Sequence, residues 1–116
     1  MVNIPKSLTV NNLNDWLNSS NEKPIIIDVR EDLEIGIASL SFVDVYIPIS
    51  KISFNYVSSI ISKYPHKQFV ILCHRGIRSY NFAQWLIENE LVKEVWNLEE
   101  GIDGWSTKID SSIPRY

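Results

Sequence analysis

The chain has 116 residues, of which 45% are hydrophobic and 22% charged, a composition typical of one globular domain with its own core. Its formal net charge of -3 argues against nucleic acid as a partner. The single cysteine excludes an internal disulfide, and no apolar stretch is long enough for a membrane span or a signal peptide. We therefore predict a single domain over 1–116 in the cytoplasm, where a thiol stays reduced.

Apolar runs alternate with helical periodicities along the chain. Strands are predicted at 25–29, 43–47, 69–72 and 95–98, whereas residues 8–10 fit either a strand or the entry to a first helix. Helices are predicted after residue 12, within 31–40, and at 52–64, 79–91 and 102–109. This alternation predicts an α/β fold with a mostly parallel sheet and helices on both faces.

Two of these helices carry specific expectations. Asn11 or Asn12 is expected to cap the first helix with its side chain. In the short helix within 31–40, Leu33, Ile37 and Leu40 are expected to point inward.

The stretch FVILCHRGIRSY, residues 69–80, places Cys73 at the end of a predicted strand. Ligands of parallel sheets bind beyond the carboxyl ends of the strands. The loop leads into a helix with Ser79 as its predicted N-cap, and free N–H groups, Gly76 and two arginines would bind an anion and favour the reactive thiolate. From these residues alone, Cys73 is either a packed core side chain, the commoner role, or a nucleophile in an anion-binding loop.

Three stretches, in this order along the chain, resemble the rhodanese-like sulfurtransferases. IIIDVREDLE (25–34) resembles the signature D-V-R-E-x-x-E, CHRGIRS (73–79) the active-site loop C-R-x-G-x-R-S, and LEEGIDGW (98–105) the signature G-G-x-x-A-W. The tail I-D-x-S-x-P-x-Y (109–116) is similar to rhodanese domains fused to adenylyltransferases of cofactor biosynthesis.

The resemblance implies that Cys73 takes sulfane sulfur from a small anionic donor such as thiosulfate and carries it as a persulfide. Cyanide, a thiol or a sulfur-carrier protein would then remove the sulfur, with no cofactor and no metal. Arg78 would brace the loop and attract the donor, and Arg75 would add charge at the mouth. The implied substrate-binding residues are His74, Arg75, Gly76, Ile77, Arg78 and Ser79.

Other residues of the matching motifs are expected to support the loop. Asp28 and Arg30 look catalytic by type, but a strand-end carboxylate and a nearby arginine more often fix loops by hydrogen bonds. Glu34 is expected to pair with a loop arginine. Trp105 is expected to pack near the loop, as its motif implies.

The spacing within the loop bears on the chemistry. Arginine follows Cys73 at the fifth position, whereas the related phosphatases place it at the sixth, which makes a wider cradle. Sulfur transfer is therefore favoured, and a small phosphatase or arsenate reductase is the weaker alternative. A sulfur-relay or regulatory module with little turnover to small acceptors is a further alternative.

His74 stands where the family usually has arginine. It is either a plain solvated loop residue or one that makes the donor site weaker at neutral pH and stronger in acid.

Overall fold

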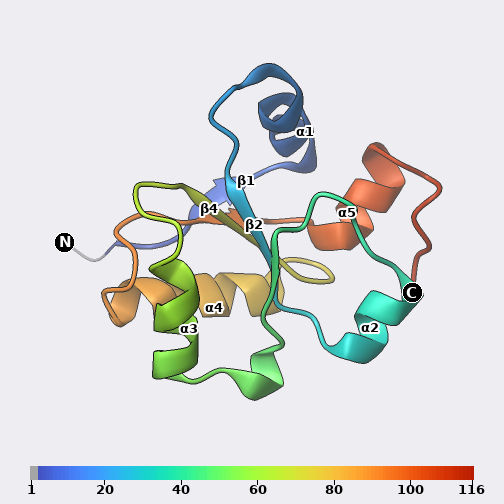
Figure 1. Ribbon diagram of the computed structural model, residues 1–116. Helices are drawn as coiled ribbons and strands as arrows, with labels where there is room; N and C mark the ends of the chain where they lie inside the picture. Colours follow the sequence, from blue (N-terminus) through green and yellow to red (C-terminus); the bar gives the residue numbers. More distant parts are fainter. Residues whose placement is uncertain (1–2) are drawn as a thin grey trace.

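The computed structural model describes residues 3–116 as a five-stranded sheet with helices on both sides (Figure 1). The strands are β1 (Lys6–Leu8), β2 (Ile25–Asp28), β3 (Val45–Tyr46), β4 (Phe69–Leu72) and β5 (Trp96–Leu98). The helices are α1 (Val10–Ser19), α2 (Asp32–Ile37), α3 (Phe54–Ile61), α4 (Ile77–Glu88) and α5 (Gly101–Lys108), with a 3₁₀ turn, η1 (Ile49–Lys51), after β3. The predicted α/β fold is confirmed.

The strands lie in the order β1-β5-β4-β2-β3, and every pair is parallel. The carboxyl ends of parallel strands share one edge of the sheet, where α/β proteins place their sites. The segments that follow β2, β4 and β5 therefore meet at this edge. They begin with Val29, Cys73 and Glu99.

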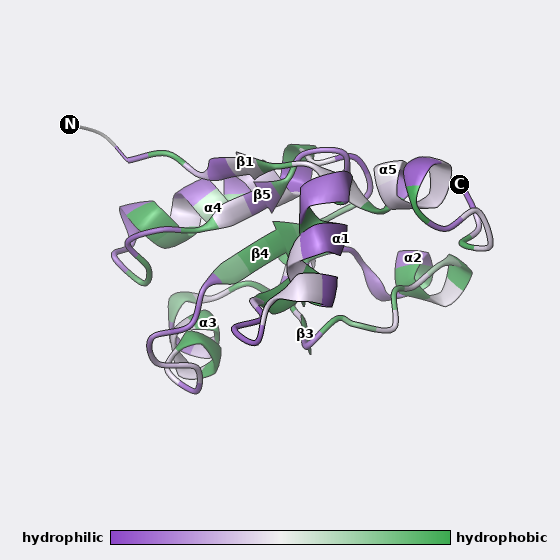
Figure 2. Ribbon diagram, turned by 90° about the horizontal axis from the view of Figure 1, so that it is seen from above, coloured by the Kyte–Doolittle hydropathy of each residue, from purple (hydrophilic) through white to green (hydrophobic). Residues whose placement is uncertain are grey.

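The two faces of the sheet carry separate cores. Ile27 and Ile71 point into the core beneath α3 and α4, whereas Ile26 and Leu72 point into the core beneath α1 and α5. Figure 1 shows α3 and α4 on one side of the strands and α1 on the other. All four residues of β2 and of β4 are buried, as expected for strands covered on both faces, and β4 is coloured as hydrophobic in Figure 2.

Two local expectations are wrong. The cap of α1 is Thr9, whose Oγ1 accepts a hydrogen bond from the backbone N–H of Asn12 at 3.1 Å, so the helix begins before both asparagines. In α2, Leu33 is 85% exposed and Ile37 is 52% exposed, against the expectation, whereas Leu40 is buried as expected, beyond the end of the helix. The helix instead turns Glu34 toward the loop after β4.

Within residues 3–116, no helix is both long enough and apolar enough to cross a membrane.

Candidate active site

Cys73 lies directly after β4, and its side chain is 1% exposed. Its Sγ accepts hydrogen bonds from the backbone N–H groups of Gly76 at 3.1 Å and Ser79 at 3.3 Å. The loop therefore curls around the sulfur and turns two N–H donors toward it, an arrangement that stabilises negative charge on sulfur. The side chain belongs to the core beneath α3 and α4 and also sits in a cradle of donors, so the packing is confirmed and the role as a nucleophile stays a prediction.

Gly76 makes this curl possible. Its φ of 94° is left-handed, and a Cβ at this position would lie 2.1 Å from the backbone oxygen of Glu99. Gly76 is the N-cap of α4, which begins at Ile77. The prediction that Ser79 caps this helix is therefore wrong: Ser79 lies within the first turn, fully buried, and the left-handed glycine starts the helix two residues earlier than its apolar pattern indicated.

The hydroxyl of Ser79 joins the sulfur to β5. Ser79 Oγ lies 3.2 Å from Cys73 Sγ and donates to Asn97 Oδ1 at 2.6 Å. The amide of Asn97 in turn donates from Nδ2 to the carbonyl of Gly76 at 3.0 Å. Asn97 was missed from the sequence, although a polar residue in a short, otherwise apolar strand is a signal that a buried partner exists.

The N-terminus of α5 holds the opposite side of the loop. The backbone N–H groups of Ile102 and Asp103 donate to the carbonyls of Cys73 at 2.9 Å and His74 at 3.0 Å. Gly101 allows this approach, because a Cβ there would lie 2.4 Å from the carbonyl oxygen of His74. Trp105, on the same helix, packs against Phe42 in the core beneath α1 and α5, so the support it gives the loop acts through its helix.

Arg78 points to Glu34 of α2. Its two terminal nitrogens each donate to a carboxylate oxygen of Glu34 at 2.7 Å. These hydrogen bonds lower the pKa of Glu34 from 4.5 to about 2 and raise the pKa of Arg78. The expected pair between Glu34 and a loop arginine is present. The carboxylate therefore balances the charge of one of the two arginines in the loop.

Asp28 and Arg30 form a fully buried ion pair behind this contact, with Arg30 Nη2 and Asp28 Oδ2 2.9 Å apart. Arg30 also donates to the carbonyl of Ala38 at 2.8 Å and to the hydroxyl of Tyr116 at 3.0 Å. Both side chains thus fix the segment after β2 by hydrogen bonds and lie away from the sulfur.

Tyr116 connects this ion pair with the loop. Its hydroxyl donates to Glu34 Oε1 at 3.0 Å, and its ring stacks on His74 with centroids 3.9 Å apart and an interplanar angle of 8°. His74 is therefore half-buried, and its Nε2 is buried without a hydrogen-bond partner, unlike a solvated loop residue. The tail is recognisable as a motif in the sequence, but the role of Tyr116 is not, because its hydroxyl bonds to Arg30 and Glu34 in the first third of the chain.

Arg75 and Ile77 complete the loop. Both are exposed, Ile77 by 73%, so Arg75 supplies the loop's most accessible positive charge. Among residues 3–116, no group of three or more histidine, cysteine, aspartate or glutamate side chains is arranged to hold a metal ion.

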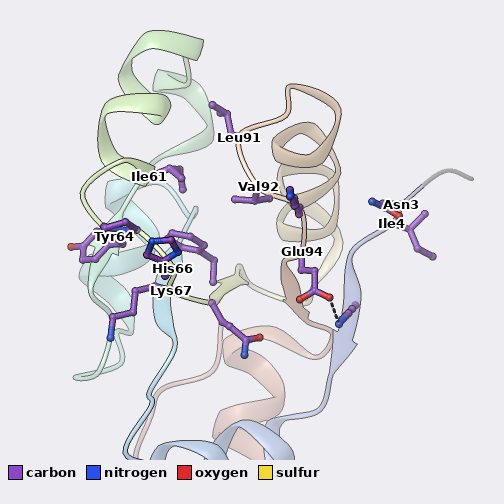
Figure 3. Close-up of a pocket in the computed structure, with 14 residues that line it drawn as sticks. Asn3, Ile4, Ile61, Tyr64, His66, Lys67, Leu91, Val92 and Glu94 are labelled. Carbon is purple, nitrogen blue, oxygen red and sulfur yellow. Dashed lines mark hydrogen bonds and ion pairs between the residues drawn. The ribbon is translucent and has the colours of Figure 1, made fainter.

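A hollow of about 820 Å³ lies at the opposite edge of the sheet, where β1, β4 and β5 begin (Figure 3). Tyr64, His66 and Lys67 line one side of it and Glu94 the other, where Glu94 pairs with Lys6. The lining contains no residue of the 73–79 loop, so this hollow is separate from the cysteine cradle.

Comparison with known proteins finds a match to the rhodanese-like domain model over residues 9–108. The rhodanese-like/PpiC domain-containing protein 12, chloroplastic, of Arabidopsis thaliana is 41% identical over 92 residues, which are 78% of this chain and 30% of that protein. The adenylyltransferase and sulfurtransferase UBA4 of Debaryomyces hansenii is 31% identical over 116 residues, covering 94% of this chain and 25% of that protein. This chain thus spans less than a third of either relative.

A crystal structure of a rhodanese-like domain protein from Staphylococcus aureus superposes with a TM-score of 0.70 and 23% identity, covering 96% of this chain and 98% of that one. At this level of identity the likeness supports the fold.

Proposed function

Because this chain belongs to the rhodanese-like domain family, we propose that it is a sulfurtransferase in which Cys73 carries sulfane sulfur as a persulfide. The observation that carries the proposal is the cradle itself, in which the N–H groups of Gly76 and Ser79 point at Cys73 Sγ. Donors held in this way by the backbone stabilise negative charge on sulfur without reorganising during the reaction.

In the first step, the Cys73 thiolate attacks the outer sulfur of a donor such as thiosulfate. A bond forms between Sγ and that sulfur, the S–S bond of thiosulfate breaks, and sulfite leaves with the bonding pair. The terminal sulfur of the persulfide then carries the negative charge. In the second step, an acceptor such as cyanide or a thiolate attacks the terminal sulfur, and Cys73 leaves as thiolate. No net oxidation or reduction of the protein occurs over the cycle.

The charges around the loop support a small anionic donor. Arg75 is exposed and can attract it, while Arg78 forms an ion pair with Glu34. The negative charge of Glu34 offsets the attraction of Arg78 for an anionic donor. Glu34→Gln should therefore lower the KM for thiosulfate by about twofold to fivefold, the range expected for a partly exposed ion pair. A higher KM would instead show that Glu34 holds Arg78 in its donor-binding position.

The spacing of the loop favours sulfur over phosphate. Arg78 follows Cys73 by five residues, and Ser79, in the sixth position, donates its backbone N–H to Cys73 Sγ and places its Oγ 3.2 Å from it. The loop is thus one residue shorter between cysteine and arginine than the wider cradle of the related phosphatases, and its N–H groups point at Cys73 Sγ.

The proposal is tested by incubating the protein with thiosulfate and measuring its intact mass. We expect one added sulfur atom on the protein and none on Cys73→Ser. Failure to form the adduct with any sulfane donor, in a folded protein, would refute the proposal, and hydrolysis of an aryl phosphate that depends on Cys73 would replace it with a phosphatase.

A sulfur-relay role toward a protein acceptor is the second candidate. It is favoured by large exposed apolar side chains near the mouth: Ile77 is part of the loop, and Leu33 adjoins Glu34, the partner of Arg78. Under this role the protein would form the persulfide but turn over cyanide slowly. Rapid turnover with cyanide would favour the first role. Either role requires a reducing compartment, such as the cytoplasm, in which Cys73 stays reduced between cycles.

A further inference from the structure

Asn97 is a buried amide, and both ends of it bond to the cysteine loop. It lies in β5, in register with Ile71 of β4, and is 5% exposed. Its Nδ2 donates to the carbonyl of Gly76 at 3.0 Å, and its Oδ1 accepts from Ser79 at 2.6 Å. A carbonyl oxygen can only accept, so the bond to Gly76 fixes which end of the amide faces the serine.

This orientation determines where the proton of Ser79 points. A serine hydroxyl has one proton, and Oδ1 of Asn97 has none to give, so Ser79 donates its proton to Asn97. Toward Cys73, 3.2 Å away, Ser79 Oγ then presents lone pairs. These lone pairs can accept a hydrogen bond from a protonated sulfur, and they repel the negative charge of a thiolate.

Other groups around the sulfur act in the opposite direction. The backbone N–H groups of Gly76 and Ser79 favour the thiolate, as does the positive charge of Arg78 on α4. Further charged or titratable groups near the loop are His74 and Arg75 within it, Glu34 of α2, which pairs with Arg78, Asp103 of α5, whose N–H bonds to the loop, and Tyr116, which stacks on His74. The sulfur therefore faces N–H donors on one side and the lone pairs of Ser79 on another, and the direction of the Ser79 proton decides what this hydroxyl contributes.

We propose that Asn97 is a positioning residue that holds the Ser79 proton away from Cys73 and so keeps the resting sulfur protonated. A thiolate formed in this arrangement faces the lone pairs of Ser79, because the hydroxyl proton stays on Asn97, and this raises the cost of losing the Cys73 proton. This role concerns the same cysteine as the proposed sulfur transfer and would set how much thiolate is ready for a donor. Its test needs no sulfur donor, so the two proposals can fail separately.

The test measures the ultraviolet absorbance of the thiolate at neutral pH. Cys73 is the only cysteine in the sequence, so subtracting the spectrum of Cys73→Ser isolates its signal. Asn97→Ala removes the acceptor and frees the Ser79 proton, and should raise the thiolate signal by about fivefold, the change that one hydrogen bond is worth. In a Ser79→Ala background, Asn97→Ala should add nothing further, because the proton it would free is absent.

Two further variants separate this role from simple loosening of the loop. Asn97→Asp keeps an oxygen for Ser79 and should lower the thiolate signal, although it loses the bond to Gly76 just as Asn97→Ala does. Ser79→Ala alone should raise the signal. Near-ultraviolet circular dichroism identifies the variants that are folded.

Three outcomes would overturn the proposal. The first is an equal effect of Asn97→Ala with and without the serine, which would show that the loop merely loosens. The second is a shift in the same direction for the alanine and aspartate variants at position 97. The third is a fall in the signal of Ser79→Ala, which would show that the hydroxyl donates to the sulfur at rest, and this result is available even if the Asn97 variants do not fold.

Discussion

Two polar networks flank the Cys73 loop. The inner network consists of Gly76, Ser79 and Asn97; it is buried and uncharged, and it touches the sulfur directly. The outer network is made of two ion pairs, Asp28 with Arg30 and Glu34 with Arg78, joined by Tyr116. Neutral dipoles therefore surround the reactive atom, and full charges brace the segments around it.

This division follows from the cost of burying charge. A buried ion needs a partner of opposite sign and several hydrogen bonds, which would occupy the space that a substrate sulfur must enter. Backbone N–H groups and a hydroxyl polarise the sulfur without that cost. The comparison predicts that changes in the outer network affect mainly stability, whereas changes in the inner network affect mainly the chemistry.

The largest effect is expected at Asp28. Asp28→Ala leaves the guanidinium of Arg30 fully buried without its carboxylate, and should lower the free energy of unfolding by about 3–5 kcal/mol, as measured by chemical denaturation. The matched control is Arg115→Ala, which breaks the more exposed pair with Asp103 and should cost about 0–1 kcal/mol. Similar losses in the two variants would contradict the view that the buried pair anchors the outer network.

Gly76 lies in the inner network, but its substitution should affect both properties. Gly76→Ala forces a Cβ toward the Glu99 carbonyl at a left-handed φ, which should cost about 1–3 kcal/mol of stability and abolish persulfide formation. Gly36→Ala is the control, because no atom lies within 4 Å of its Cβ and the residue is within α2. This control should gain about 0.5–1 kcal/mol. A Gly76→Ala protein that still forms the persulfide would show that the curl is not needed.

Tyr116 should give a smaller effect. Tyr116→Phe keeps the stack on His74 and removes the hydroxyl that bonds to Arg30 and Glu34, so unfolding should become easier by about 0.5–1.5 kcal/mol. Tyr56→Phe, at an exposed tyrosine, should stay within about 0.5 kcal/mol of the parent protein. If Tyr116→Phe matched this control, the hydroxyl would not join the two ion pairs.

The smallest effect is a pH dependence at Glu34. Its pKa falls from 4.5 to about 2 on folding because of its hydrogen bonds to Arg78, so its contribution to stability is complete above about 4.5 and is lost as the pH falls toward 2. The stability difference between the parent protein and Glu34→Gln should therefore be constant near neutral pH and shrink in acid. Glu22→Gln, at an exposed glutamate, serves as the control. If the stability difference between the parent protein and Glu34→Gln does not change with pH, the ion pair of Glu34 with Arg78 is not its cause.

Much of the fold follows from local patterns in the sequence. The β-branched run of β2 and the apolar run of β4 predict strands buried on both faces, and the step from β4 into α4 predicts a site at Cys73. The start of α4 does not follow from these patterns, because apolar periodicity does not reveal a helix that begins at a left-handed glycine.

The partners of the loop were harder to predict. Asn97 and Tyr116 reach the loop through contacts set by the packing of distant elements, so the sequence can show that Asn97 is a polar residue in an apolar strand but not which residues the two side chains contact. The exposure of Leu33 and Ile37 has a similar origin, because the direction of α2 is set by the capping box between Glu31 and Glu34 and by the bond from Arg78.

One glycine within the loop, Gly76, and one beside it, Gly101, leave no space between the loop and the turn after β5. The backbone of Gly76 packs directly against that of Glu99, and the backbone of Gly101 packs against the carbonyls of Cys73 and His74. The turn between β5 and α5 is therefore in close contact with the cysteine loop at two places. Lengthening the loop by one residue, the simplest way to engineer room for a larger oxyanion, would push it into that turn. A successful redesign would have to rebuild residues 99–101 together with the loop, so that the two segments change as one unit.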